Sequence, residues 1–296
     1  MPTTQVDDIT LHFDTFGSAQ DPTLLLVAGL GAQMTSFEDE LCVQLAALGT
    51  HVVRFDNRDA GLSTHLDGVE VDVLSAVSSA LGGEPVDGPY DLSDLAADAM
   101  AVLDALEVET AHVLGTSMGG MIAQTITIEH PHRVRSLVSV YSTTGEPEVG
   151  TPDPEVLASM LGSMSPAVSR DERIASSVEL ARLISTKWCF DEARTRQKAA
   201  ESIDRAYNPD GTSRQLVAIL SSGSRAEQLP LVTVPTIVLH GDEDPLVHHS
   251  GGVRTAELIP SAELRTLERM GHDLPPEYWH HVTGAVTDVL RSSAPA

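Results

Sequence analysis

Short apolar runs alternate with amphipathic stretches along the first half of the chain. Residues 23–27 (TLLLV), 51–55 (HVVRF) and 111–115 (AHVLG) are short and mostly apolar, as is typical of strands buried on both faces of a sheet. Between such runs, apolar residues recur every three or four positions, which predicts helices that bury one face. Strands that alternate with helices over short connections predict an α/β protein with a mostly parallel sheet flanked by helices.

The alternation stops after residue 142 and resumes near residue 233. Residues 143–232 have helical stripes and no strand pattern, whereas residues 236–240 and 262–267 again read as strands. A helical block of about 90 residues is far longer than the usual connection of about 2–6 residues between a strand and a helix. We therefore expect residues 1–142 and 233–296 to form an α/β core, and residues 143–232 to form an inserted helical cap.

The charge balance narrows the range of partners. Lys and Arg total 18 against 43 Asp and Glu, which gives a formal net charge of −25. Nucleic acids and anionic membranes are bound by positive surfaces, so we expect neither as a partner. The two cysteines, Cys42 and Cys189, are far apart and fit a reducing compartment. With no leader pattern or long apolar run in the sequence, we expect a cytoplasmic protein.

Residues 115–119 read Gly-Thr-Ser-Met-Gly and carry the clearest chemical signal. This G-x-S-x-G motif follows a predicted strand and opens a predicted helix, which is the context of a nucleophile elbow. The sharp turn exposes the oxygen of Ser117 above the sheet, and the glycines are needed where a Cβ atom would collide with the turn. The sequence thus predicts Ser117 as a nucleophile.

A serine hydroxyl needs a base that accepts its proton. His272 follows the last predicted strand, and a loop at a strand end lies at the same edge of the sheet as Ser117. The adjacent pairs at 248–249 and 280–281 cannot share one helical or strand face, so we expect them to be solvated rather than to bind a metal. His272 is therefore the predicted base.

The base in turn needs a carboxylate that holds its tautomer and stabilises the imidazolium. Three acids, Asp242, Glu243 and Asp244, follow the strand at 236–240. We favour Asp244, since Pro245 would rigidify the loop beside it, and keep Asp242 as the alternative. The resulting order of Ser117, Asp244 and His272 is the order of α/β-hydrolases.

The negative charge that develops on a substrate oxygen needs backbone N–H donors. One candidate is Met118, the residue after the nucleophile. The other is Leu30, which lies in the glycine-rich loop 28–31 after the first buried strand. Asp56 and Arg58 in a later loop are expected to hold that loop through an ion pair and hydrogen bonds.

These motifs together make the chain resemble an α/β-hydrolase with a helical cap, and within that superfamily it is similar to the aclacinomycin methylesterase-like group. The resemblance rests on loop 28–31, residues 55–63, the segment around Ser117, residues 241–245 and residues 270–272. It implies a triad of Ser117, Asp244 and His272, with Leu30 and Met118 as oxyanion donors. Two positions depart from the commoner superfamily pattern: Ala28 replaces a His, and Asp59 stands where a Gly often follows the Arg.

A serine nucleophile argues against the epoxide hydrolases and haloalkane dehalogenases of this fold, which use an Asp at that position. Hydrolysis of a small-molecule carboxylic ester through an acyl-enzyme is the favoured reaction. Lactone hydrolysis, C–C bond hydrolysis and cofactor-free perhydrolysis would use the same residues, and a non-catalytic ligand receptor is the alternative from another class. None of the favoured reactions calls for a cofactor or a metal.

Residues of the predicted cap should determine the substrate. Met160 and Met164 are four positions apart and share a helical face, and Trp188 is one of the few aromatic residues of the cap. These three residues are the candidate substrate contacts. Ordinary packing within the cap is the favoured explanation of the two methionines; if they do line the substrate pocket, the pocket is aliphatic and deformable.

Overall fold

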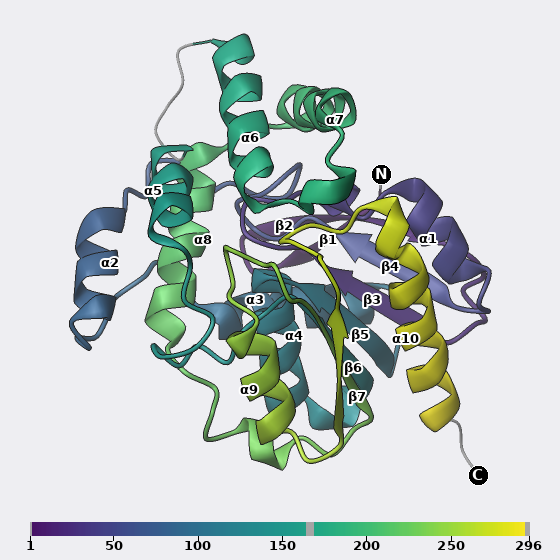
Figure 1. Ribbon diagram of the computed structural model, residues 1–296. Coiled ribbons are helices and arrows are strands. Elements are labelled where there is room, and N and C mark those ends of the chain that lie inside the picture. Colours follow the sequence, from purple (N-terminus) through teal and green to yellow (C-terminus); the bar gives the residue numbers. More distant parts are fainter. Residues whose placement is uncertain (1, 164–168, 294–296) are drawn as a thin grey trace.

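An eight-stranded sheet runs through the computed structural model, which describes residues 2–163 and 169–293 (Figure 1). The strand order is β1-β2-β4-β3-β5-β6-β7-β8. The pairs β1–β2 and β2–β4 are antiparallel, and all other neighbours are parallel, so the α/β fold predicted from the sequence is confirmed. The strands are β1 (Thr3–Val6), β2 (Ile9–Phe16), β3 (Thr23–Val27), β4 (His51–Phe55), β5 (Ala111–Thr116), β6 (Val134–Val140), β7 (Thr236–Gly241) and β8 (Ala262–Leu267).

The apolar pattern of the sequence predicts the inner strands of the sheet, but it does not predict the edge strand β1. Every residue of β3, β4 and β5 is buried, as a continuous apolar run requires. Strand β1 escapes the pattern because it is an edge strand of Thr, Thr, Gln and Val that pairs only with β2. An edge strand in contact with solvent has little apolar signal to detect.

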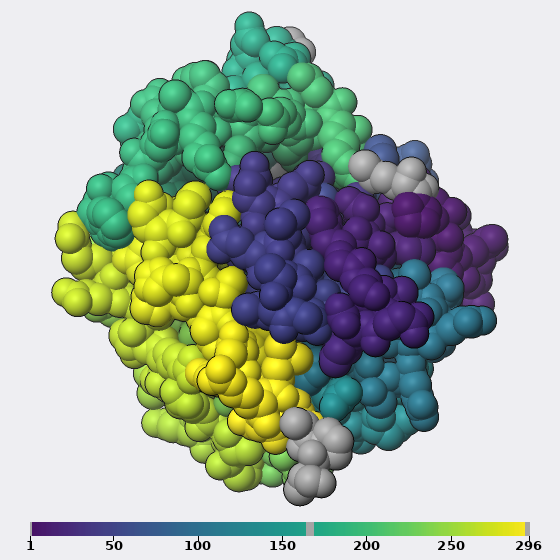
Figure 2. Space-filling view, turned by 90° about the vertical axis from the view of Figure 1, so that its right-hand side faces the viewer, coloured from purple at the N-terminus to yellow at the C-terminus, as the bar shows by residue number. Residues whose placement is uncertain are grey.

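Helices cover both faces of the sheet. Helices α3 (Leu92–Ala105) and α4 (Met118–Glu129) pack on one face, while α1 (Asp39–Ala46) and α10 (Trp279–Ser292) pack on the other. Figure 2 shows this second face, with α10 in yellow beside α1 in dark blue. Helix α9 (Ser250–Leu258) lies between β7 and β8 in the chain.

A capping box opens α3. The Asp91 side chain accepts hydrogen bonds from the backbone N–H groups of Ser93 and Asp94, and the Asp94 side chain accepts from the N–H of Asp91. Helix α2 (Val73–Leu81) precedes α3 in the chain, and none of its residues is buried.

Among the described residues, the chain between β6 and β7 forms α5 (Pro154–Ser163), α6 (Arg170–Ile184), α7 (Glu192–Arg205) and α8 (Pro209–Ser222). Helices α6, α7 and α8 reach the carboxyl ends of the parallel strands (Figure 1), where the loops that follow β8, β4 and β3 contact them directly. The division of the chain into a core and a cap at 143–232 stays a prediction.

Ion pairs fasten α7 and α8 to loops of the sheet. Arg205 at the end of α7 contacts Asp56 with an N–O distance of 2.7 Å. Arg214 on α8 contacts Asp59 at 2.6 Å, and both side chains of this pair are buried. These contacts fix the two helices over the loop that follows β4. Within the parts of the chain that are described, no helix combines the length and apolar character needed to cross a membrane.

Candidate active site

Ser117 lies on a strained turn between β5 and α4. Its backbone angles are φ 55° and ψ −121°, a conformation that costs about 1–3 kcal/mol for a residue with a side chain. Two contacts hold it: its N–H donates to the carbonyl of Val140 at 2.9 Å, and its carbonyl accepts from the hydroxyl of Ser142 at 2.8 Å. Ser117 is only half-buried, whereas Thr116 and Met118 on either side are buried.

The glycines of the motif are required by the close approach of backbone segments. A Cβ atom on Gly115 would lie 1.9 Å from the carbonyl oxygen of Gly119. A Cβ atom on Gly119 would lie 2.0 Å from the carbonyl oxygen of Val27 on β3. Real Cβ contacts do not reach such distances, so the turn that exposes Ser117 forms only with glycine at both positions.

The structure brings Ser117, His272 and Asp244 into one chain of hydrogen bonds. The Ser117 Oγ lies 3.0 Å from His272 Nε2, and His272 Nδ1 lies 2.7 Å from Asp244 Oδ2. Asp242 and Glu243 are exposed and do not join this chain. Instead, the Asp242 carboxylate accepts a hydrogen bond from the backbone N–H of Arg269 and so secures the loop that leads to His272.

Asp244 is buried and remains ionised. Its Oδ1 accepts hydrogen bonds from the N–H groups of Leu246 and Val247, both at 2.9 Å. Burial acts to raise the pKa of Asp244, but the neighbouring His272 and His240 outweigh it and hold this pKa well below its usual range. The ionised Asp244 accepts a hydrogen bond from the N–H group at His272 Nδ1. The proton of the neutral ring is then on Nδ1, so Nε2 is free to accept a proton from Ser117.

His240 is a neighbour that the sequence reading misses. Its Nε2 lies 3.4 Å from Asp244 Oδ2 and 2.8 Å from the carbonyl of Val247. His240 is the penultimate residue of β7, four residues before Asp244, and its only local signal is that spacing.

The loop that contains Leu30 passes directly against Ser117. A Cβ atom on Gly29 would lie 3.2 Å from the Cβ of Ser117. Met118 is the first residue of α4, so its N–H has no partner within the helix. The next N–H along the loop, that of Gly31, donates to the side-chain oxygen of Gln215 on α8 at 2.8 Å.

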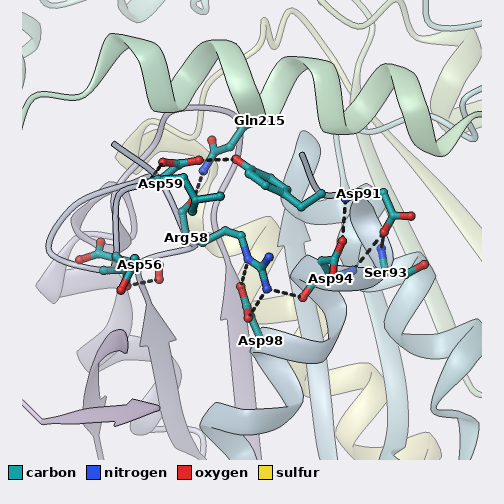
Figure 3. A network of polar contacts seen from close by, with 12 residues as sticks. Asp56, Arg58, Asp59, Asp91, Ser93, Asp94, Asp98 and Gln215 are labelled. Carbon is teal, nitrogen blue, oxygen red and sulfur yellow. Dashed lines mark hydrogen bonds and ion pairs between the residues drawn. The ribbon is translucent and has the colours of Figure 1, made fainter. Parts of the chain in front are cut away.

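Gln215 joins this loop to the one that follows β4. Its amide nitrogen donates to the carbonyl of Arg58 at 2.8 Å, as Figure 3 shows. Arg58 in turn forms two hydrogen bonds with the buried carboxylate of Asp98, at 2.6 and 2.7 Å. The expected ion pair between Asp56 and Arg58 is therefore wrong, because Asp56 pairs with Arg205; each residue nevertheless helps to hold the loop.

A cavity of about 320 Å³ opens beside Leu30 and extends between α6, α7 and α8. Its lining includes neither Met160 nor Trp188. The Trp188 side chain is 48% exposed and its indole N–H donates to the hydroxyl of Tyr278. Met164 lies outside the described residues. The role of these three residues in substrate binding stays a prediction.

The other histidines do not join the hydrogen-bonded chain, although the ring of His249 packs against that of His240 with centroids 5.6 Å apart. His248 contacts the hydroxyl of Ser250, and the rings of His280 and His281 lie beside each other on α10. Within residues 2–163 and 169–293, no group of three His, Cys, Asp or Glu side chains is arranged to hold a metal ion.

Comparison with known proteins agrees with this architecture. A family model described as the alpha/beta hydrolase fold matches residues 22–277. Rhodomycin D methylesterase DnrP of Streptomyces peucetius is 30% identical over 295 residues, and rhodomycin D methylesterase DauP of Streptomyces sp. (strain C5) is 31% identical; each match covers 93% of both chains. The solved structure of the enol-lactonase from Burkholderia xenovorans LB400 superposes with a TM-score of 0.74 at 21% identity, over 98% of this chain and all of the other. The chain belongs to the α/β-hydrolase fold family.

Proposed function

We propose that the protein is a carboxylic ester hydrolase in which Ser117, His272 and Asp244 form the catalytic triad. The observation that carries the proposal is the hydrogen-bonded chain itself, with 3.0 Å from Ser117 Oγ to His272 Nε2 and 2.7 Å from His272 Nδ1 to Asp244. Its position at a strained strand-to-helix turn supports the same role for Ser117, because strain of this kind is retained at functional sites.

The first half of the reaction transfers the acyl group to the enzyme. Ser117 Oγ attacks the ester carbonyl carbon while its proton moves to His272 Nε2, and Asp244 stabilises the imidazolium that forms. The N–H groups of Leu30 and Met118 donate to the oxygen that becomes negative. His272 then gives its proton to the departing alkoxide, the C–O bond breaks, and an alcohol leaves behind an acyl-Ser117 ester.

The second half repeats these steps with water. His272 removes a proton from a water molecule as its oxygen attacks the acyl carbon. The tetrahedral intermediate collapses, Ser117 Oγ regains the proton from His272, and a carboxylic acid leaves. Every proton that His272 accepts is returned within the cycle, so the mechanism needs no cofactor.

The relatives favour ester cleavage over the other reactions that the same triad could catalyse. The two Streptomyces proteins that match over 93% of their length are named methylesterases. Lactone hydrolysis is the second candidate, since a protein named 3-oxoadipate enol-lactonase 2 from Acinetobacter baylyi is 23% identical over 96% of this chain. A lactone is a cyclic ester, and it would be opened by the same steps.

The proposal also includes the domain organisation, the partner and the cellular location of the enzyme. We assign residues 143–232 to a cap over the site, a small-molecule ester as the partner, and the cytoplasm as the location. The two cysteines support the last point, because Cys42 and Cys189 are both free thiols, as expected in a reducing compartment.

Hydrolysis of p-nitrophenyl acetate and of simple methyl esters tests the proposal. Ser117→Ala should lose several orders of magnitude of kcat, since a triad acts as a unit, while its melting temperature stays close to that of the wild type. Ser93→Ala is a matched control, because the Ser93 hydroxyl is exposed and contacts only Glu129, and it should retain full activity. A Ser117→Ala enzyme that still hydrolyses these esters at the wild-type rate would refute the assignment.

A further inference from the structure

The cavity beside the proposed active site contains one charge that no described residue balances. Its charged lining residues are Asp59 and Arg173. Asp59 is matched by Arg214, through two hydrogen bonds of 2.6 and 2.8 Å. Within residues 2–163 and 169–293, Arg173 has no carboxylate partner, and the residues outside those ranges include no Asp or Glu. The uncompensated charge in the lining is therefore positive.

The guanidinium of Arg173 is held in place, but its N–H groups form no hydrogen bond with a described residue. Its central carbon lies 4.0 Å from the centroid of the Tyr207 ring, a stacking contact that fixes the plane of the group. The Nε atom is buried and donates to no described residue. A buried donor without an acceptor is costly, and a planar guanidinium with free edges matches the two oxygens of a carboxylate.

Helix α6 connects this guanidinium with the proposed catalytic residues. Arg173, Leu180 and Ile184 line the cavity along one face of α6. At the far end of that face, the carbonyl of Ile184 accepts a hydrogen bond of 2.7 Å from the N–H of His272. Eleven positions along an α-helix correspond to about 16 Å, so the lining extends over about this length of α6, from Ile184 beside His272 to Arg173; Ser117 and His272 themselves do not line the cavity.

The lining of the cavity along α6 and α7 is mixed. Leu180, Ala181, Ile203 and Ala206 supply apolar surface, and Ser176, Ser177 and Ser202 supply hydroxyl groups. An extended hydrocarbon or a fused-ring skeleton would lose water-exposed apolar surface there. The protein as a whole has a net charge of −25, so its overall electrostatic field repels anions. Attraction of an anion into this cavity would therefore depend on the local positive charge of Arg173.

We propose that Arg173 selects elongated esters that carry a carboxylate about 15 Å from the scissile carbonyl, a distance taken from the length of α6 along the cavity. The inference rests on the proposed esterase function and adds its substrate class. The ester carbonyl lies at Ser117 and Leu30, the apolar body occupies the middle of the cavity, and the far carboxylate accepts two hydrogen bonds from Arg173.

A pair of matched probes tests this inference. The first is the monomethyl ester of dodecanedioic acid, which has a carboxylate at its far end, and the second is the primary amide of the same half-ester, which is neutral. The measured quantity is the ratio of kcat/KM for the acid to kcat/KM for the amide at pH 8. Hydrogen bonds to charged groups contribute enough that Arg173→Met should lower this ratio by about tenfold or more, mainly through KM for the acid.

Two further variants separate charge from structure. Arg173→Lys keeps the charge without the planar fork and should give an intermediate ratio. Arg196→Met is the matched control, because Arg196 is an exposed arginine of α7 that pairs with Glu192 and does not line this cavity; it should keep the wild-type ratio. Monomethyl succinate is too short to reach both ends, so the preference for its acid over its amide should be absent.

The outcomes distinguish the two proposals. If the wild type cleaves the neutral amide probe and the ratio is the same in Arg173→Met, the selection of a carboxylate is refuted while the esterase proposal stands. If the wild type cleaves neither these probes nor p-nitrophenyl esters, the esterase proposal fails and this inference fails with it. A preference for the acid that disappears in Arg173→Met and persists in Arg196→Met supports the inference.

Discussion

Replacing Arg214 by Met should destabilise the protein more than the loss of any exposed ion pair. The side chain of Arg214 is 2% exposed and that of Asp59 is fully buried. Asp59 also accepts hydrogen bonds from the hydroxyl of Tyr90 at 2.8 Å and from the N–H of Leu66 at 2.9 Å. These neutral donors remain in Arg214→Met, but the buried carboxylate loses the only countercharge that contacts it among the described residues.

The expected loss is about 3–5 kcal/mol, the usual cost of removing one partner of a buried pair. For a domain of this order of size, about 2–4 °C of melting temperature is lost per kcal/mol, so the variant should melt roughly 10 °C lower. Replacing both residues, as Asp59→Asn with Arg214→Met, removes the unpaired charge and should recover part of the loss.

The loss should depend on pH in a definite direction. Burial acts to raise the pKa of Asp59, but its bonds with Arg214, Leu66 and Tyr90 hold this pKa below the ordinary value. In the wild type the pair thus contributes stability that is full above the unfolded-state pKa of about 3.9 and declines as the pH falls. In Arg214→Met, burial raises the pKa of Asp59 above the unfolded value, so the penalty is largest at high pH and shrinks as Asp59 is protonated.

Urea denaturation at pH 8 and pH 5 measures these differences. Arg170→Met is the control, because Arg170 pairs with Asp204 at the surface, and exposed pairs contribute little. Equal unfolding free energies for Arg214→Met and Arg170→Met at pH 8 would show that the buried pair contributes no more stability than an exposed one. A loss in Arg214→Met that grows toward pH 5 would contradict the sign of the pH effect.

Three other predictions concern the loops around the site. Asp244→Asn should reduce kcat by about 10⁴-fold, the loss known for the acid of a Ser-His-Asp triad, whereas Asp242→Asn should lose far less; steady-state rates would contradict this if Asp242→Asn were the inactive variant. Gln215→Leu removes the acceptor of the Gly31 N–H and should lower kcat about fivefold with little change in KM, as expected for about 1 kcal/mol; an unchanged kcat would argue against a role in positioning the loop. Gly119→Ala should give no soluble folded protein in circular dichroism, since its Cβ atom would lie 2.0 Å from a carbonyl oxygen of β3.

The residues of the proposed triad are predictable because each has a local signature. Ser117 lies between a strand and a helix with glycines on both sides, and His272 follows a strand end. Among the acids, the sequence favours Asp244 only through the proline that follows it. The structure gives the physical reason, because Asp242 is turned toward the N–H of Arg269 and Asp244 toward His272.

The residues that shape the cavity have no such signature. Gln215 contacts Gly31, and Arg214 contacts Asp59, across separations of more than 150 residues. A helical stripe tells which face of α8 is buried, but it does not tell which loop that face meets. That Arg173 has no carboxylate partner in the described part of the chain is likewise a property of three-dimensional packing, since acidic residues 171 and 172 precede it directly in the sequence.

Isolation of the acyl-enzyme shows whether Ser117 is the nucleophile. The wild type is mixed with excess p-nitrophenyl acetate, the reaction is stopped with acid within the first turnover, and the protein is digested and examined by mass spectrometry. We expect a burst of one equivalent of nitrophenol, together with one acetyl group on the peptide that contains Ser117. Turnover with no acetylated peptide, or with the acetyl group on another residue, would contradict the proposed role of Ser117.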